Sequence, residues 1–375
     1  MSDSSASTTT PFIAEDVVRA AVAAVARLPA VPACVALEFA TPARDALWLV
    51  RALRAALADT LAGQTAVPRL CVLHDSRCCP GVVAAAKIRA GLLLHFGPTC
   101  CCCPRAALPC PLAVLPNPFV PHDAPALAAA LIDATRDAGT DGPVVVALDA
   151  ELGDRAASLC AAVPAPAPLF CHQTLLKDDD DTKDDGTLCF AGWRLPRDIG
   201  TLVYVGSSRA AACAMQASVP AAAFRAVFLP GSDSEGNDDE GTEEAARMLV
   251  RGRMGLAMRR SHALEAVRDA ESMALLVAGP LHADAARALR ARIADVPVRT
   301  VAMAEVDEYR LANLPETHAG VAVIAACPYT LTFVQTRRFD RPVVSAAECV
   351  AAVTDDPDWV EHYTTDIDAA LSRLH

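Results

Sequence analysis

Short apolar runs rich in Val, Leu and Ala alternate with stretches of helical periodicity along almost the whole chain of 375 residues. This alternation is typical of βαβ units, in which helices join parallel strands. The runs form three groups of similar build. We therefore predict an α/β fold with three similar small domains, each a parallel sheet flanked by helices. After a tail and a first helix at 1–29, the domains span 30–140, 141–268 and 269–375.

The positions of the strands follow from the same pattern. Strand-like runs lie at 34–39, 69–74, 91–96 and 112–115 in domain 1, at 143–148, 201–205 and 226–229 in domain 2, and at 273–278, 298–301, 321–325 and 342–344 in domain 3. A long helical stretch at 243–270 leads into domain 3, and its arginines, Arg260 among them, fall on polar positions.

Three of the strand-like runs end at, or just before, a cysteine. The first leads to Cys78 and Cys79, the second to Cys100, and the third, in domain 3, to Cys327. In open parallel sheets ligands bind at the carboxyl ends of the strands. We expect Cys79 and Cys100 in neighbouring loops at one edge of the same sheet, whereas Cys327 comes from another domain. Thiolates that meet there indicate a metal or an iron–sulfur cluster between domains rather than a disulfide.

Two other interpretations of these cysteines stay open. Cys78 and Cys79 can be ordinary loop thiols. The run Cys100–Cys103, followed by Cys110, can instead be a zinc site with a Cys-x-x-Cys pair, although four adjacent cysteines cannot all face one ion.

Other cysteines and histidines have simpler interpretations. Five cysteines lie in apolar surroundings and are expected to act as small buried hydrophobes: Cys34, Cys71, Cys160, Cys213 and Cys349. His74 and His95 at strand ends are candidate ligands, but a histidine at such a place is more often a hydrogen-bonded structural group.

Composition excludes several classes of protein. Fifteen cysteines in 375 residues are fewer than a secreted disulfide scaffold has, and the first eleven residues lack the basic region of a secretory signal. No apolar run is long enough to span a membrane. The net charge of −12 lies almost wholly in two acidic inserts, 177–186 and 231–244, which we expect to be solvated loops. The nearly neutral remainder does not suit nucleic acid, and we expect a cytoplasmic protein.

The segments around the cysteines resemble the diphthamide-synthesis proteins. The likeness rests on His74–Cys79, His95–Cys100, Leu108-Pro109 and Val114–Pro116, then on Leu202–Gly206 and Met258–Arg260, and finally on Arg310–Glu316, Ala326–Pro328 and Phe339–Ser345 with Glu348. Within that family the chain is most similar to subunit 2 of 2-(3-amino-3-carboxypropyl)histidine synthase.

The resemblance implies a radical-type reaction that uses S-adenosylmethionine and a [4Fe-4S] cluster held by three cysteines. The reaction transfers a 3-amino-3-carboxypropyl group to a histidine of elongation factor 2. The implied ligands are Cys100, Cys327 and Cys79, with Cys78 as the alternative to Cys79. One iron without a protein thiolate is left open for the methionyl part of S-adenosylmethionine.

The resemblance also implies which subunit this chain is. The family's catalytic subunit has a Gly-Cys pair after the middle-domain strand, whereas this chain has Gly206-Ser207. That difference fits the auxiliary subunit, which supports reduction of its partner's cluster, so we assign no catalytic residue to the chain itself. The implied partners are the catalytic subunit 1 in a heterodimer, elongation factor 2 as substrate, and a small electron-donor protein. The alternatives are a scaffold without a functional cluster and a thiol or zinc protein.

Overall fold

A computed structural model describes the chain in segments: 13–39, 46–62, 67–73, 82–99, 108–119, 123–136, 142–163, 168–173, 187–229, 249, 254–255, 258, 260–278, 282–293, 296–303, 311, 313, 320–327, 329, 342–361, 363–365 and 367–371. The described residues belong to two compact units. One comprises the chain up to Thr99 together with Leu108–Ala124, and the other runs from Pro125 onward.

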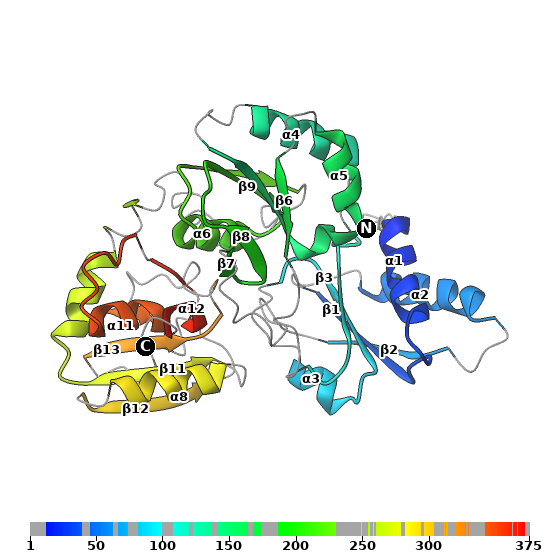
Figure 1. The fold of residues 1–375 in the computed structure, drawn as a ribbon. Helices are drawn as coiled ribbons and strands as arrows, with labels where there is room; N and C mark the ends of the chain where they lie inside the picture. Colours follow the sequence, from blue (N-terminus) through cyan, green and yellow to red (C-terminus); the bar gives the residue numbers. More distant parts are fainter. Residues whose placement is uncertain are drawn as a thin grey trace, which may run out of the picture. The chain divides into compact units, whose positions relative to one another are not determined.

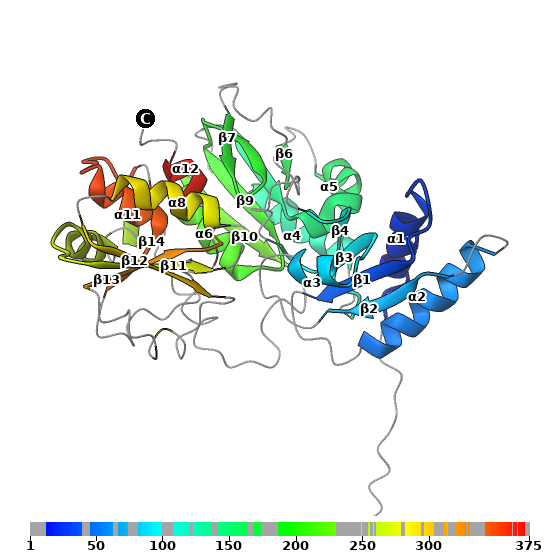
Figure 2. The same cartoon turned by 90° about the horizontal axis from the view of Figure 1, so that it is seen from below.

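The first unit contains a four-stranded parallel sheet in the order β2-β1-β3-β4. Its strands are β1 (Cys34–Phe39), β2 (Arg69–Val72), β3 (Leu92–Phe96) and β4 (Leu112–Leu115). Alternate residues of β1 and β3 point to opposite faces. Val35 and Leu94 pack under α1 (Glu15–Ala26) and α2 (Ala46–Thr60), while Ala36 and Leu93 pack with α3 (Val82–Lys87). Figures 1 and 2 show α1 beside α2 on one face of this sheet.

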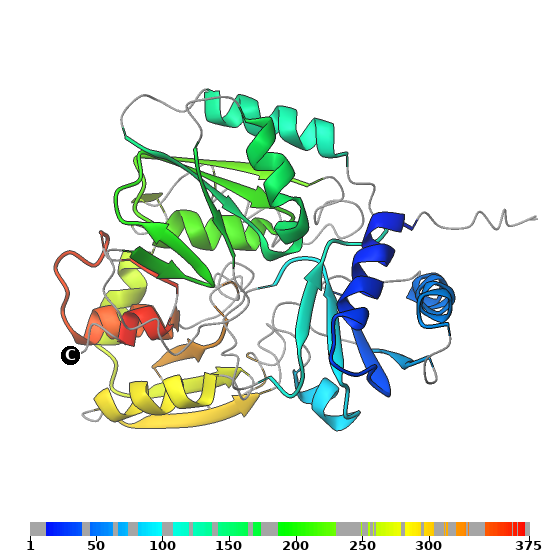
Figure 3. The ribbon, with the colours of Figure 1, turned by 45° about the vertical axis from the view of Figure 1, so that its right-hand side comes forward.

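The second unit begins with a sheet in the order β10-β9-β5-β6, again parallel. The strands are β5 (Val144–Leu148), β6 (Leu169–His172), β9 (Thr201–Gly206) and β10 (Ala223–Phe228). One face packs against α4 (Ala124–Arg136), the 3-10 helix η2 (Ala150–Arg155) and α5 (Ala156–Ala162). Helix α6 (Arg209–Ser218) lies on the other side of the sheet (Figure 3).

An antiparallel hairpin follows β6, formed by β7 (Thr187–Phe190) and β8 (Trp193–Pro196). Its two turn residues, Ala191 and Gly192, both have positive φ angles, of 43° and 89°. Two such residues in succession make the tight turn that matches the twist of a hairpin. The indole of Trp193 donates a hydrogen bond to the Leu148 carbonyl at 3.0 Å, which ties the hairpin to β5.

The same unit contains a third parallel sheet in the order β12-β11-β13-β14. Its strands are β11 (Met273–Ala278), β12 (Val298–Met303), β13 (Val321–Ala325) and β14 (Val343–Ser345). One face is covered by α8 (Ala283–Arg292), α11 (Ala346–Val353) and α12 (Ile367–Leu371). Leu275, Val323 and Val344 pack under these helices.

The α/β architecture predicted from the sequence is confirmed. The predicted strands form parallel sheets, and their ends differ from those expected by up to three residues. The pattern did not predict β6, β7 or β8. The three domain boundaries stay a prediction, as does the solvation of the acidic inserts 177–186 and 231–244, which lie outside the described residues.

Candidate functional site

The three large sheets share one strand order. In each, the first and third strands of the group lie side by side at the centre: β1 beside β3, β5 beside β9, and β11 beside β13. The chain leaves these two strands toward opposite edges of the sheet, and ligands of open α/β sheets bind at the carboxyl ends of such a pair. The third strands lead to Cys100, Ser207 and Cys327 in turn. A binding site is therefore expected at the residues that follow the third strands.

Cys327 lies two residues beyond β13, and its side chain is 6% exposed. Its sulfur accepts a hydrogen bond from the backbone N–H of Tyr329 at 3.5 Å. The thiol lines a small recess with Ser345, Ala346 and Ala347 at the amino end of α11. The thiol thus lies just beyond the carboxyl end of a central strand, where ligands of such sheets bind, and this place fits a metal-ligating sulfur.

The other predicted ligands, Cys78, Cys79 and Cys100, lie outside the described residues. The strands that precede them, β2 and β3, run parallel on either side of β1 and so end at one edge of the sheet. Among the described residues, no group of three Cys, His, Asp or Glu side chains could hold a metal ion. The ligand set therefore stays a prediction.

His95, the second candidate histidine, is a structural group. It is fully buried in β3, its Nδ1 lies 2.9 Å from Oε2 of Glu38, and its Nε2 lies 3.1 Å from the Pro98 carbonyl. Because a carbonyl only accepts, Nε2 carries a proton. The other nitrogen shares a proton with the carboxyl group of Glu38. Both ring nitrogens therefore point at protein groups. His74 lies outside the described residues.

The carboxyl edge of the second sheet carries a buried polar network that sequence reasoning missed. Asp149, directly after β5, accepts hydrogen bonds from the Tyr204 hydroxyl at 2.7 Å and the Ala150 N–H at 2.9 Å. Glu151 accepts from the N–H of Ser207 at 2.9 Å and from its hydroxyl at 2.5 Å. Two acids directly after a wholly apolar strand were the available signal, because buried carboxylates require partners.

Burial, with the charge of Asp149 as the next cause, raises the pKa of Tyr204 well above its ordinary value of 10.0. Tyr204 therefore remains a neutral donor at physiological pH. These hydrogen bonds hold the carboxyl edge of the second sheet together.

Gln173 extends this network toward the third sheet. It follows β6 and is 5% exposed. Its Oε1 accepts from the Ala150 N–H at 3.2 Å, and its Nε2 donates to the Ala191 carbonyl at 2.7 Å. The same Nε2 lies 3.4 Å from the hydroxyl of Tyr329, on the segment that follows Cys327.

The cysteines predicted to be buried hydrophobes fall into two groups. Cys34, Cys213 and Cys349 are buried, whereas Cys71 and Cys160 are only half-buried. The sulfurs of Cys34 and Cys71 are 3.7 Å apart, well beyond the ~2.05 Å of a disulfide bond. Burial, followed by the charge of Glu348, raises the pKa of Cys349 to about 12. Cys349 is therefore an inert thiol.

Arg260, expected on a polar position of its helical stretch, is largely buried beside a carboxylate. Its side chain is 14% exposed, and it donates to both oxygens of Glu348, from Nε at 2.6 Å and from Nη2 at 2.7 Å. Glu348 also accepts from the N–H of Ser345 at 2.7 Å and the hydroxyl of Tyr363 at 2.9 Å. A fully buried carboxylate needs a positively charged partner, and this requirement explains why Arg260 is buried.

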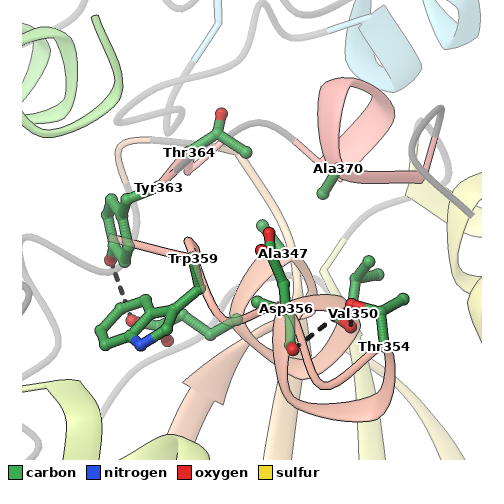
Figure 4. Close-up of a pocket in the computed structure, with 10 residues that line it drawn as sticks. Ala347, Val350, Thr354, Asp356, Trp359, Tyr363, Thr364 and Ala370 are labelled. Carbon is green, nitrogen blue, oxygen red and sulfur yellow. Dashed lines mark hydrogen bonds between the residues drawn. The ribbon is translucent and has the colours of Figure 1, made fainter. Parts of the chain in front are cut away.

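A cavity of about 260 Å³ lies beside this ion pair (Figure 4). Glu348, Trp359, Tyr363 and Ala370 are among the residues that line it, and the aromatic rings of Trp359 and Tyr363 meet edge to face. Glu348 directs its oxygens at its four donors. The ion pair thus joins the helical layer of the third sheet to the helical residues 260–268.

Comparison with known proteins agrees with this architecture. The family model described as "Putative diphthamide synthesis protein" matches residues 55–364, which is most of the chain. The crystal structure of Dph2 from Pyrococcus horikoshii superposes with a TM-score of 0.55 at 14% identity, covering 90% of each chain. A structure of the same protein with a 4Fe-4S cluster gives 0.54 at 14% identity, over 93% of this chain and 92% of that one. No curated protein matches.

The helices of the described segments include none that is both long and apolar enough to cross a membrane.

Proposed function

Because the chain belongs to the diphthamide synthesis protein family, we propose that it is the auxiliary iron–sulfur subunit of the synthase for the first step of diphthamide formation. That step moves a 3-amino-3-carboxypropyl group from S-adenosylmethionine to a histidine of elongation factor 2. In this proposal the chain forms a heterodimer with the catalytic subunit in the cytoplasm. It receives electrons from a small donor protein and supports reduction of its partner's cluster.

The observation that carries the proposal is the position of Cys327. The thiol lies at the carboxyl end of a central strand, beside a helix amino terminus, and accepts a backbone N–H. With Cys100 and Cys79, or Cys78 in its place, it would hold a [4Fe-4S] cluster, which supplies one-electron chemistry when bound. The cluster named for the Pyrococcus horikoshii protein supports this assignment.

The auxiliary role is supported by Ser207. It follows β9, where the family's catalytic subunit has a cysteine, and its hydroxyl donates to the buried carboxylate of Glu151. A serine held in this way offers no thiolate to a cluster. The chain's own residues at this edge bind one another.

Anaerobic reconstitution followed by iron and sulfide analysis tests the cluster. The parent chain should bind about four iron ions with visible charge-transfer absorption. Cys327→Ala should lose most of both, whereas Cys349→Ala, a matched change at a buried thiol with a raised pKa, should retain them. If a variant with Cys79, Cys100 and Cys327 all changed to Ala binds as much iron as the parent, the ligand assignment is wrong. Stoichiometric zinc in place of iron would make the chain a zinc protein.

The auxiliary role requires a second assay. Modification of elongation factor 2 is measured with the catalytic partner and limiting reductant. Cluster-free variants should slow the reaction, because the partner's cluster is then reduced less often. A chain without these cysteines that supports modification as well as the parent would instead be a scaffold.

A further inference from the structure

A side-chain contact links the segment that carries Cys327 to the second sheet. Tyr329 is 3% exposed, and its hydroxyl lies 3.4 Å from Nε2 of Gln173. The backbone N–H of the same tyrosine donates to the Cys327 sulfur. One residue therefore connects the second sheet to the candidate ligand, through its side chain on one side and its backbone on the other.

We propose that Gln173 and Tyr329 are positioning residues for the Cys327 thiol, and that their contact fixes the direction in which its sulfur points. The inference rests on the proposed function, in which Cys327 is a cluster ligand. Neither residue touches the reacting groups. Their effect is on the place and the hydrogen bonding of the sulfur.

Gln173 suits this role because it is itself held at both ends of its amide. Its Oε1 accepts from Ala150 directly after β5, and its Nε2 donates to Ala191 in the tight turn of the β7–β8 hairpin. A buried amide with these partners cannot turn without breaking hydrogen bonds and leaving buried polar groups unsatisfied. The hydroxyl of Tyr329 therefore contacts an amide whose position is fixed.

The short chain between Tyr329 and Cys327 transmits the contact. They are separated by a single residue, so a shift of the tyrosine moves the N–H that binds the sulfur. Hydrogen bonds to cluster sulfurs are among the features that set reduction potentials. Loss of the contact should make the potential of the reconstituted cluster more negative, since the bond stabilises negative charge on the sulfur.

The first test uses the full chain without metal. The rate at which iodoacetamide alkylates Cys327 is measured by mass spectrometry in Tyr329→Phe and in Gln173→Leu. Because Cys327 is buried, iodoacetamide reaches it only when its segment opens. Loss of a hydrogen bond of about 1 kcal/mol should make the opened form about fivefold more populated, so each variant should react about fivefold faster than the parent. The double variant should react no faster than the single ones, because both changes remove the same contact.

Tyr363→Phe is the matched control. It also removes the hydroxyl of a buried tyrosine in the same unit, but that hydroxyl bonds Glu348. It should leave the alkylation rate of Cys327 unchanged even though it lowers stability. An unchanged rate in Tyr329→Phe, or an equal rise in the control, overturns the proposal. Because this assay needs no cluster, a chain that binds no iron would refute the proposed function and leave the positioning result readable.

The second readout is the midpoint potential of the reconstituted cluster. Tyr329→Phe should shift it to more negative values, and Tyr363→Phe should not. A general loss of stability lowers cluster occupancy without moving the potential of the clusters that remain. No shift in Tyr329→Phe would contradict the proposed effect on the sulfur.

Discussion

The buried ion pair between Arg260 and Glu348 gives the sharpest prediction about stability. Glu348→Gln keeps the size of the side chain and the hydrogen bonds with Ser345 that cap α11, since glutamine also serves in a capping box. It removes the negative charge and replaces one acceptor oxygen with an amide donor, which then faces the donors of Arg260 and Tyr363. Arg260, 14% exposed, is left with its cation facing a neutral amide. The variant thus measures the cost of leaving the buried arginine without its carboxylate.

The magnitude follows from the contacts. Arg260 makes two charge-assisted hydrogen bonds to the carboxylate, at 2.6 and 2.7 Å, and such bonds contribute about 1.5–3 kcal/mol each. Removing one partner of a buried pair costs about 3–5 kcal/mol. We expect a loss of about 3–5 kcal/mol, which corresponds to a fall of about 6–20 °C in the melting temperature of a unit of this size.

The assay is thermal and urea unfolding followed by tryptophan fluorescence, because Trp359 packs on Tyr363 beside the pair. The double variant Arg260→Met with Glu348→Gln should recover most of the loss, since it leaves no charge buried. A loss below about 1 kcal/mol in the single variant, or no recovery in the double variant, would refute the reasoning.

The same pair predicts how stability depends on pH. Burial by itself would raise the pKa of Glu348, but the charge and hydrogen bonds of Arg260 outweigh it, so the pKa lies below its ordinary value of 4.5. A carboxyl group whose pKa is lowered on folding contributes fully above its unfolded pKa. The difference in stability between the parent and Glu348→Gln should therefore be constant at neutral pH and shrink as the pH falls below 4.5. A difference that grows in acid would contradict this sign.

Two further predictions concern other buried groups. A Cβ at Gly206 would lie 2.6 Å from Oδ2 of Asp149 and also against the Tyr204 hydroxyl, so Gly206→Ala should cost about 1–3 kcal/mol in urea unfolding. Gly153→Ala, where a Cβ meets nothing within 4 Å, is the control and should change stability by less than about 0.5 kcal/mol; equal losses would show that crowding is not the cause. His95→Phe should lower stability yet leave the iron bound per folded chain unchanged, because both ring nitrogens already have partners. A clear fall in the iron bound per folded chain in this variant would make His95 a ligand.

The central strands could be predicted because they are buried on both faces. Strands such as β3, β9 and β13 consist of consecutive buried residues, and a parallel sheet covered by helices requires such continuous apolar runs. Strands β6, β7 and β8 could not be predicted in this way. Each has four residues with partly exposed positions, so none forms a continuous apolar run.

Contacts between distant segments were beyond a pattern-based prediction. Arg260 and Glu348 are 88 positions apart, and Gln173 and Tyr329 are 156 apart. Helical periodicity assigns an arginine to the solvent side because an unpaired cation is costly to bury. It carries no information about a carboxylate that another element brings to the same place. For Cys327 the prediction of a strand end agrees with the structure, and its role as a ligand stays a prediction.

The repeated strand order separates what the fold determines from what single residues determine. Three sheets with the same order present the same place, after the third strand, three times, although the residues there differ. After β13 that place holds a thiol beside a helix amino end, and after β9 it holds a serine bonded to a buried carboxylate.

The backbone thus supplies equivalent positions, and the side chain with its nearest partners determines whether a position can bind a metal. A thiolate is a soft ligand that binds iron, whereas the hydroxyl of Ser207 donates to a charged carboxylate. This difference, rather than the strand order, is the physical basis for expecting metal chemistry at Cys327 and structural support at Ser207.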